Sequence, residues 1–245
     1  MKTIAIMQPT YLPWIGYFDL IDQVDQFVIL DSVAFSHQSW QHRNRIRTGN
    51  GLDWLTVPVR VKGKFGQRIV DVEISESTKF PVSHIGQISL NYGKAAFFEE
   101  SAEILETIAS FSAGSLLHQL TESIIRQLAG LLDIPTPMIR SSELACAGQR
   151  SSLLVAICNE LQADHYLSPV GSVEYLRTDI DLFKAAGISI VIQNFEHPNY
   201  PQMFSPFISH ASVIDALLNT GAKTTRSLIK SGSHPPLLLE AQRDA

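Results

Sequence analysis

Residues 1–31 read MKTIAIMQPTYLPWIGYFDLIDQVDQFVILD and contain two apolar runs, at residues 3–7 and 27–30. Continuous apolar runs are typical of parallel strands, because helices cover both faces of such a sheet. A parallel pair needs a crossover connection, and residues 14–24 can supply it as a helix. The stretch therefore predicts a β-α-β unit with an aromatic turn after its first strand. Ligands of open α/β sheets bind at such carboxyl strand ends.

The composition is that of an ordinary globular protein, with 245 residues, 45% of them hydrophobic and 18% charged. A net charge of -5 argues against a nucleic-acid-binding surface, which depends on many Lys and Arg contacts with phosphate. Cys146 and Cys158 stand twelve positions apart without a pattern of disulfides or zinc ligands. No apolar stretch reaches the ~18 residues of a membrane helix. We expect a cytoplasmic protein with no export signal and no membrane insertion.

The rest of the chain continues the alternation of strands and helices. Residues 138–139, 165–167 and 188–192 are predicted strands, and the helices between them carry apolar residues at helical spacing. Residues 32–61 are predicted to form a loop and a hairpin beside the turn, and residues 69–74 alternate like a further strand. We predict a mostly parallel Rossmann-like α/β sheet flanked by helices, with a helical segment inserted around residues 84–132.

Capping residues and glycines indicate where the predicted helices begin and end. Ser75, Ser77 and Thr78 are candidate caps before the helical segment, and Gly114 with Ser115 is expected to separate two helices within it. Residues 1–231 are expected to form a single α/β domain, followed by a flexible polar tail at residues 232–245.

Polar residues follow the predicted strands and would meet at one edge of a parallel sheet. They are Gln8 and Thr10, Asp31 and Ser32, residues 141–143, Ser168, and Gln193 with Asn194. One interpretation is a small-molecule pocket; the other, favoured at each position taken alone, is that strands simply end in polar turns. Asp31 is the strongest candidate, because a carboxylate directly after an apolar strand needs a cation, a donor or a ligand. It could serve as a base or contact a ribose.

Arginines recur at alternating positions in the segment after the first β-α-β unit, at Arg43, Arg45 and Arg47, with Asn44 between them. Arginine forks suit phosphate or carboxylate. A solvated edge strand protected by charge explains the spacing equally well. Because the segment follows the aromatic turn closely, we favour contact with a nucleotide phosphate or a substrate carboxylate.

Eight histidines are scattered along the chain, and none shows the spacing of metal ligands, so no metal site is predicted. His84 and His197 stand at element boundaries near the proposed pocket and are the histidine candidates for acid-base chemistry. Ordinary structural roles remain the alternative for both. Residues 168–172, SPVGS, lack the pattern of a hydrolase serine and are better suited to presenting backbone amides to an anion.

Several motifs together resemble the WbqC-like family over residues 4–221. They are QPTYLPWIGYF at residues 8–18, Trp40 with RNRI at 43–46, WLTVPV at 54–59, YLS at 166–168 with EYL at 174–176, YPQ at 200–202 and SVID at 212–215. The resemblance implies a bacterial cytoplasmic protein whose relatives are associated with O-antigen and other surface-polysaccharide gene clusters. Some relatives are described as glycyl or acyl transferases. The resemblance supplies no catalytic residues.

A second resemblance concerns the first 35 residues, which are similar to the opening of pantothenate synthetase and other nucleotidyltransferases of the HIGH type. Those enzymes activate a carboxylate as an adenylate, and this implies ATP as the candidate cofactor. The chain departs from the motif at Trp14 and Tyr17, which stand in place of its two histidines. A Trp and a Tyr could instead stack on a base or a sugar ring.

The leading hypothesis is a transferase that attaches an aminoacyl or other acyl group to an amino sugar, carried as a nucleotide derivative, in surface-polysaccharide synthesis. Amide formation needs an unprotonated amine, so Asp31, His84 or His197 would act as the base. With the motif residues included, the substrate-binding candidates are Gln8, Thr10, Tyr11, Trp14, Tyr17, Arg43, Asn44, Arg45, Ser168 and Gln202.

Two other hypotheses stay open. An enzyme that adenylates a carboxylic acid would release pyrophosphate from ATP, whereas transfer from a preformed acyl donor would not. A non-catalytic sugar- or nucleotide-binding protein would use the same turn and arginines without a base. In each case the expected partners are small molecules, namely a nucleotide-sugar or amino sugar and an acyl donor. A homo-oligomeric assembly also stays open.

Overall fold

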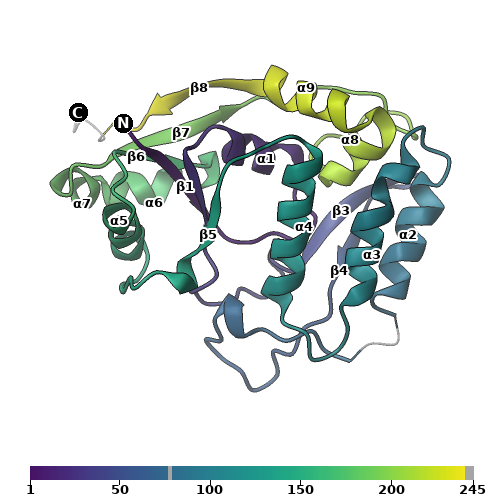
Figure 1. Cartoon of the computed structure of the whole chain (residues 1–245), viewed down its shortest axis with the longest axis horizontal. Helices are drawn as coiled ribbons and strands as arrows, with labels where there is room; N and C mark the ends of the chain where they lie inside the picture. Colours follow the sequence, from purple (N-terminus) through teal and green to yellow (C-terminus); the bar gives the residue numbers. More distant parts are fainter. Residues whose placement is uncertain (77–78, 241–245) are drawn as a thin grey trace.

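A computed structural model describes residues 1–76 and 79–240, and its centre is a six-stranded sheet with the order β5-β2-β1-β6-β7-β8 (Figure 1). The strands are β1 (Thr3–Met7), β2 (Gln26–Ile29), β5 (Met138–Arg140), β6 (His165–Ser168), β7 (Ser189–Phe195) and β8 (Ser233–Leu238). All neighbours are parallel except β7 and β8, which are antiparallel. The predicted mostly parallel, Rossmann-like sheet is confirmed.

The topological switch point of the sheet lies between β1 and β6. From β1 the chain builds outward through β2 to β5, then returns to the other side of β1 and builds outward through β6 and β7. β1 and β6 pair from Thr3 with His165 to Ala5 with Leu167. The crevice beyond the carboxyl ends of two such strands is the usual ligand position in open α/β sheets.

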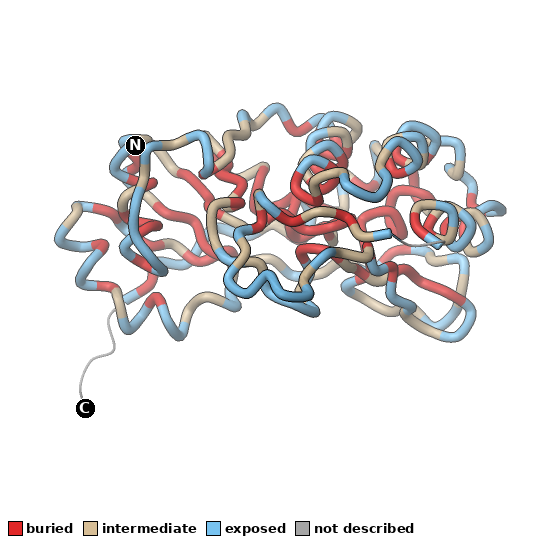
Figure 2. Tube along the Cα trace, turned by 90° about the horizontal axis from the view of Figure 1, so that it is seen from below, coloured by how far each residue is buried: buried red, intermediate tan, exposed pale blue. Residues whose placement is uncertain are grey.

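Helices cover both faces of the sheet, and successive side chains of β1 point to opposite faces. Ala5 belongs to one hydrophobic cluster, whereas Ile4 and Ile6 belong to another. The cluster that includes Ala5 contains residues from α1 (Ile15–Asp22), α2 (Val82–Tyr92), α3 (Ala102–Ser110), α4 (Leu117–Leu131), α8 (Val213–Thr220) and α9 (Ala222–Gly232). The other face carries α5 (Ser151–Glu160), α6 (Val173–Thr178) and α7 (Ile180–Ala185). Figure 2 shows the buried segments running through the middle of the molecule.

The predicted helical segment at residues 84–132 is present as α2, α3 and α4, with the 3-10 turn η2 (Phe98–Ser101) before α3. The break between α3 and α4 contains Gly114, whose φ of +87° lies in the left-handed region that glycine tolerates. Ser77 and Thr78, two of the expected caps, lie outside the described residues. Over residues 1–76 and 79–240, no helix combines the length and the hydropathy needed to cross a bilayer.

Three segments differ from the sequence prediction. β3 (Arg43–Thr48) and β4 (Gly51–Thr56) pair as a separate hairpin that begins earlier than expected. Residues 69–74 form the 3-10 turn η1 (Ile69–Asp71) and two isolated bridges instead of a strand. Residues 233–238, predicted to belong to a flexible tail, form β8. Pairing with the open edge of β7 explains this last correction, because backbone hydrogen bonds to an edge strand do not require an apolar pattern in the added segment.

Candidate functional site

The aromatic turn between β1 and α1 is held by segments distant in sequence. The N–H of Val213 at the start of α8 donates to the Pro13 carbonyl at 2.7 Å. The side-chain amide of Asn44 on β3 donates to the Leu12 carbonyl at 2.8 Å. Leu12 has a φ of +46°, which is uncommon for a branched residue and persists only where the surroundings enforce it. The hairpin and α8 therefore fix the turn in one conformation.

A cavity of about 290 Å³, here called the aromatic cavity, lies beside this turn. It is lined by Met7, Thr10, Trp14, Tyr17, Trp40, Asn44, Arg45 and His210. Its volume is near the lower end of the range of about 300–1,000 Å³ for small-molecule sites. The buried Tyr17 hydroxyl donates to the Gln8 carbonyl at 3.2 Å, and burial raises its pKa, so it stays a neutral phenol. Apolar walls with a few polar groups suit a ligand of about one ring.

Two histidines stack on the Trp14 indole at this cavity. The His210 ring lies 4.9 Å from it, and the His197 ring lies 5.9 Å away and nearly parallel. His197 has both nitrogens engaged by backbone, Nδ1 with the Pro198 carbonyl at 2.9 Å and Nε2 with the N–H of His210 at 3.2 Å. His210 uses Nδ1 with Ser209 Oγ at 2.8 Å. Partial burial and then the charge of Arg45 lower the pKa of His210, which favours its neutral form.

Arg45 connects the cavity to the exposed face of the β3–β4 hairpin. Its guanidinium lies 5.3 Å from the Trp40 ring and 5.5 Å from the Trp54 ring, and Trp54 is its cross-strand partner. Arg43 lies 4.3 Å over the Trp54 ring. Cation–π contacts of this kind hold the two guanidiniums without neutralising them. The hairpin therefore presents positive charge at the mouth of the cavity.

A larger cavity of about 940 Å³, here called the large cavity, lies at the same edge of the sheet. It is lined by Gln8, Leu30, residues 32–34, residues 148–150, Leu153, Leu154, Tyr175, Thr178 and Asp179. Leu153 and Leu154 belong to the hydrophobic cluster of Ile4 and Ile6, so this cavity lies on the opposite side of β1 from the aromatic cavity. Arg150 precedes α5, and Asp179 accepts a hydrogen bond of 2.5 Å from Ser151 Oγ. The lining thus contains charges of both signs.

Comparison with known proteins identifies the family. The model of the WbqC-like protein family matches residues 8–227, which include the aromatic turn, the hairpin and α8. The chain belongs to the WbqC-like family. It is also similar to the uncharacterized protein Rv1507c of Mycobacterium tuberculosis (strain ATCC 25618 / H37Rv), with 34% identity over 224 residues that cover 91% of this chain and 96% of that protein. No solved structure matches the chain significantly.

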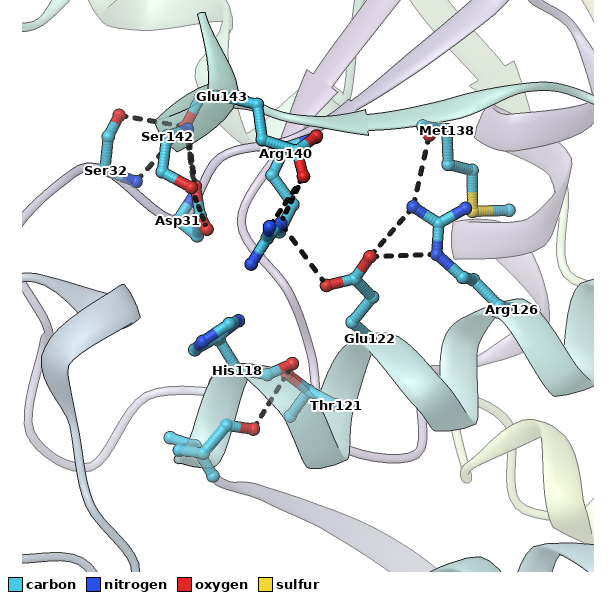
Figure 3. A network of polar contacts seen from close by, with 12 residues as sticks. Asp31, Ser32, His118, Thr121, Glu122, Arg126, Met138, Arg140, Ser142 and Glu143 are labelled. Carbon is cyan, nitrogen blue, oxygen red and sulfur yellow. Dashed lines mark hydrogen bonds and ion pairs between the residues drawn. The ribbon is translucent and has the colours of Figure 1, made fainter. Parts of the chain in front are cut away.

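Asp31 of this WbqC-like protein lies in neither cavity. Its buried carboxylate accepts hydrogen bonds from Ser141 Oγ at 3.0 Å, from the Ser142 N–H at 2.9 Å and from Ser142 Oγ at 2.7 Å (Figure 3). Ser141 Oγ in turn accepts from the Asp31 N–H at 3.1 Å. These bonds join the end of β2 to the 3-10 turn η3 (Ser141–Glu143) after β5. The donors that Asp31 needs are thus supplied by the fold.

His84 and Tyr11 form a buried pair on the WbqC-like turn. Tyr11 Oη lies 2.9 Å from His84 Nδ1, and His84 Nε2 lies 3.1 Å from the Thr56 carbonyl. A carbonyl can only accept, so Nε2 carries the proton and Nδ1 accepts from the tyrosine. Burial lowers the pKa of His84 to about 4. Both side chains support the turn and hairpin from behind and line neither cavity at the switch point.

The remaining predicted residues divide between the cavities and the scaffold. Gln202 bonds the Ile208 backbone at 2.9 Å and Asp215 at 2.6 Å, which shapes the loop that carries His210. Ser168 is buried at the end of β6, and its Oγ has no partner among the described residues. Gln8 lines the large cavity, whereas Thr10, Trp14, Tyr17, Asn44 and Arg45 line the aromatic cavity. Arg43 is not in the lining of either cavity, and its guanidinium lies over the Trp54 ring.

Sequence reasoning missed His210 and Arg150. His210 follows a proline-rich loop with no pattern that singles out one histidine, and only the stacking on Trp14 identifies it. Arg150 stands in the stretch GQRSS directly before α5, where a glycine and a basic residue precede a helix start. That combination was a usable signal for an anion contact. In the described residues of this WbqC-like protein, no three His, Cys, Asp or Glu side chains gather as metal ligands.

Proposed function

We propose that this protein transfers an acyl or aminoacyl group to the amine of an amino sugar, linked to a nucleotide, in bacterial surface-polysaccharide synthesis. One observation carries the proposal: two cavities of unequal size lie on opposite sides of the end of β1, where Met7 lines one and Gln8 lines the other. A transferase must bring two substrates together, and these two cavities are lined by neighbouring residues at one strand end.

The aromatic cavity is proposed to hold the amino sugar. Aromatic side chains such as Trp14 and Tyr17, which line the cavity, are suited to contact with a sugar ring, and Thr10 supplies a hydroxyl beside them. His210 is the proposed base, because its pKa is lowered and its Nε2 has no hydrogen-bond partner among the described residues. His197 is proposed to position His210, since it accepts the His210 N–H and stacks against both His210 and Trp14.

The large cavity is proposed to hold the acyl donor, with Arg150 near the anionic group that activates it. In the reaction the amine nitrogen attacks the acyl carbonyl carbon and passes a proton to His210. The carbon–oxygen or carbon–sulfur bond to the activating group breaks, and that group leaves with the electron pair. Asp31 and His84 have no part in this scheme, because their polar atoms are engaged within the fold.

The test is a search for amide product by mass spectrometry. Purified protein is incubated with amino sugars, free and nucleotide-linked, and with either an acyl thioester or an amino acid plus ATP. Product formation in the first mixture supports simple transfer; product with pyrophosphate release in the second indicates that the enzyme also makes an adenylate. His210→Gln should lower kcat by about 10²–10⁴, the usual contribution of a general base.

His234→Gln is the matched control, because this exposed histidine lies on β8 and lines neither cavity. Its kcat should equal that of the unaltered protein. Binding of an amino sugar without product from any donor would overturn the transferase proposal and indicate a binding protein. Full activity of the His210→Gln variant would exclude His210 as the base.

A further inference from the structure

The β3–β4 hairpin and the turn before it carry a second group of side chains next to the aromatic cavity, here called the Trp–Arg platform: Trp40, Trp54, Arg43 and Arg45. The two indole rings lie 5.2 Å apart with an interplanar angle of 38°. Arg43 covers Trp54 at 4.3 Å, and Arg45 lies within 5.5 Å of both rings. The four side chains form one continuous stack.

The two tryptophans of the platform are exposed, although exposing a large apolar ring to water is unfavourable. Trp40 is 47% and Trp54 is 42% accessible to solvent, and a pair of adjacent indoles at a protein surface commonly marks a binding site. The other tryptophan, Trp14, is half-buried in the aromatic cavity. All three tryptophans of the chain thus lie at one site.

The platform also carries unbalanced positive charge in a chain whose net charge is -5. Five other arginines have carboxylate partners, namely Arg60, Arg68, Arg126, Arg140 and Arg226. Within residues 1–76 and 79–240, Arg43 and Arg45 form no ion pair, and their buried Nε atoms have no hydrogen-bond partner. Arg43 uses one Nη2 bond on the Gln38 carbonyl, at 2.5 Å. Two adjacent, unpaired guanidiniums are complementary to a group with more than one negative charge.

The position of Arg45 between the aromatic cavity and the two platform indoles indicates the order of chemical groups in the ligand. Arg45 lines the aromatic cavity and also contacts both platform indoles, so an anion on Arg45 lies between a ring in the cavity and a ring on the platform. We propose that the Trp–Arg platform binds the nucleoside diphosphate of a nucleotide-linked sugar, with the diphosphate on Arg45 and Arg43 and the base against Trp40 and Trp54. This inference rests on the proposed function, because it takes the ring in the aromatic cavity to be the sugar acceptor.

Intrinsic fluorescence provides a direct test, because every tryptophan reports on this site. The full chain is titrated with UDP, and with uridine, pyrophosphate and glucuronic acid as partial probes. We expect saturable quenching by UDP, at least tenfold weaker binding of each partial probe, and weaker UDP binding as the salt concentration rises. Glucuronic acid binding as tightly as UDP would overturn the proposal, since a carboxylate sugar would then satisfy the platform.

Variants locate the site. Trp54→Ala and Arg45→Gln should each raise the Kd for UDP at least tenfold, and Arg45→Lys should recover only part of the loss because it lacks the fork. The matched comparison is Arg150→Gln, which removes an arginine from the lining of the large cavity and should leave the UDP Kd unchanged. The opposite pattern, with UDP affinity lost in Arg150→Gln and kept in Arg45→Gln, would place the nucleotide in the large cavity and overturn the proposal.

The two proposals fail in different ways. UDP binding at the platform without amide formation from any donor leaves this inference standing and removes the transferase. Equal kcat/KM for a free amino sugar and its nucleotide-linked form removes this inference and leaves the transferase. Circular dichroism of each variant checks that it is folded, which is expected because Trp54 is exposed to solvent and Arg45 is only partly buried.

Discussion

The indole of Trp14 occupies the space that a β-carbon on residue 16 would need. A Cβ built on Gly16 would lie 2.3 Å from Cη2 of Trp14 and 2.4 Å from Cζ2. Gly16 is within α1 and has an ordinary helical backbone, so its role is to make room. The glycine thus allows the tryptophan to lie flat over the first turn of the helix and form a wall of the aromatic cavity.

Replacing Gly16 with Ala should therefore displace the indole. Alanine in a helix normally stabilises a protein by up to about 1 kcal/mol over glycine. Here we expect a loss of about 1–3 kcal/mol instead, as for an overpacked core, together with a shift in tryptophan emission. Urea unfolding measures the first effect and fluorescence the second. The control is Gly86→Ala on α2, where nothing lies within 4 Å of the new Cβ and a gain is expected. Equal gains in both variants would contradict the packing argument.

His84 should make the protein less stable in mild acid. Burial lowers its pKa to about 4, below the value of about 6.5 for an unfolded chain. The unfolded chain therefore binds the extra proton between those two values, and the free energy of unfolding falls as the pH drops from about 6.5 to about 4. In His84→Gln this pH dependence should be weaker, although the variant is less stable at pH 7. Urea unfolding at several pH values tests this; a slope identical to that of the unaltered protein would contradict it.

Asp31 should contribute to stability and not to turnover. In Asp31→Asn one acceptor oxygen becomes a donor that faces Ser141 or Ser142, and an unsatisfied buried group costs about 1–3 kcal/mol. We expect a lower free energy of unfolding with an unchanged kcat for the folded fraction. Asp181→Asn, at an exposed position on α7, is the control and should change neither quantity. A folded but inactive Asp31→Asn protein would restore the catalytic role predicted from the sequence.

The acid limb of the pH–rate profile should depend on Arg45. Partial burial and the Arg45 charge lower the pKa of His210, so kcat/KM should fall only below the ordinary value of about 6.5. Removing the charge in Arg45→Gln should raise the pKa and move the limb toward higher pH, in addition to weakening substrate binding. The measurement is kcat/KM from pH 4.5 to 8. An acid limb at the same pH in both proteins would show that another group titrates.

The parallel sheet was predictable because its strands are short, apolar and separated by helices with a clear periodicity. The start of the β3–β4 hairpin and the strand β8 were not, since their sequences are basic or rich in exposed residues. In β3 the Arg43 guanidinium stacks on Trp54, and the guanidinium of the buried Arg47 donates hydrogen bonds to backbone carbonyls. These contacts stabilise the two charged side chains within the strand. In β8 only backbone pairing with β7 decides the conformation. Such partners lie far away in sequence and leave no local pattern.

The site was predictable where residues share one strand end or one turn, as do Gln8, Thr10, Trp14 and Tyr17. Asp31 was singled out because a carboxylate after an apolar strand needs a partner, which is correct, and His84 because it stands at an element boundary. The sequence could not indicate whether that partner is a ligand or the fold. The structure gives Asp31 two serines and His84 a tyrosine and a carbonyl. His210 needed the opposite information, namely which loop stacks on Trp14.

The alternation of side chains along β1 has a consequence for how specificity can change. Met7 belongs to the aromatic cavity, lined by the aromatic turn, β3 and the loop before α8, and Gln8 to the large cavity, lined by α5, α6 and the segment after β2. These two sets of walls come from different parts of the chain and different hydrophobic clusters. Substitutions in one set of lining residues can therefore reshape one cavity and leave the other untouched. Under the proposed function, specificity for the acyl donor and specificity for the acceptor sugar can therefore change independently in proteins that share this sheet.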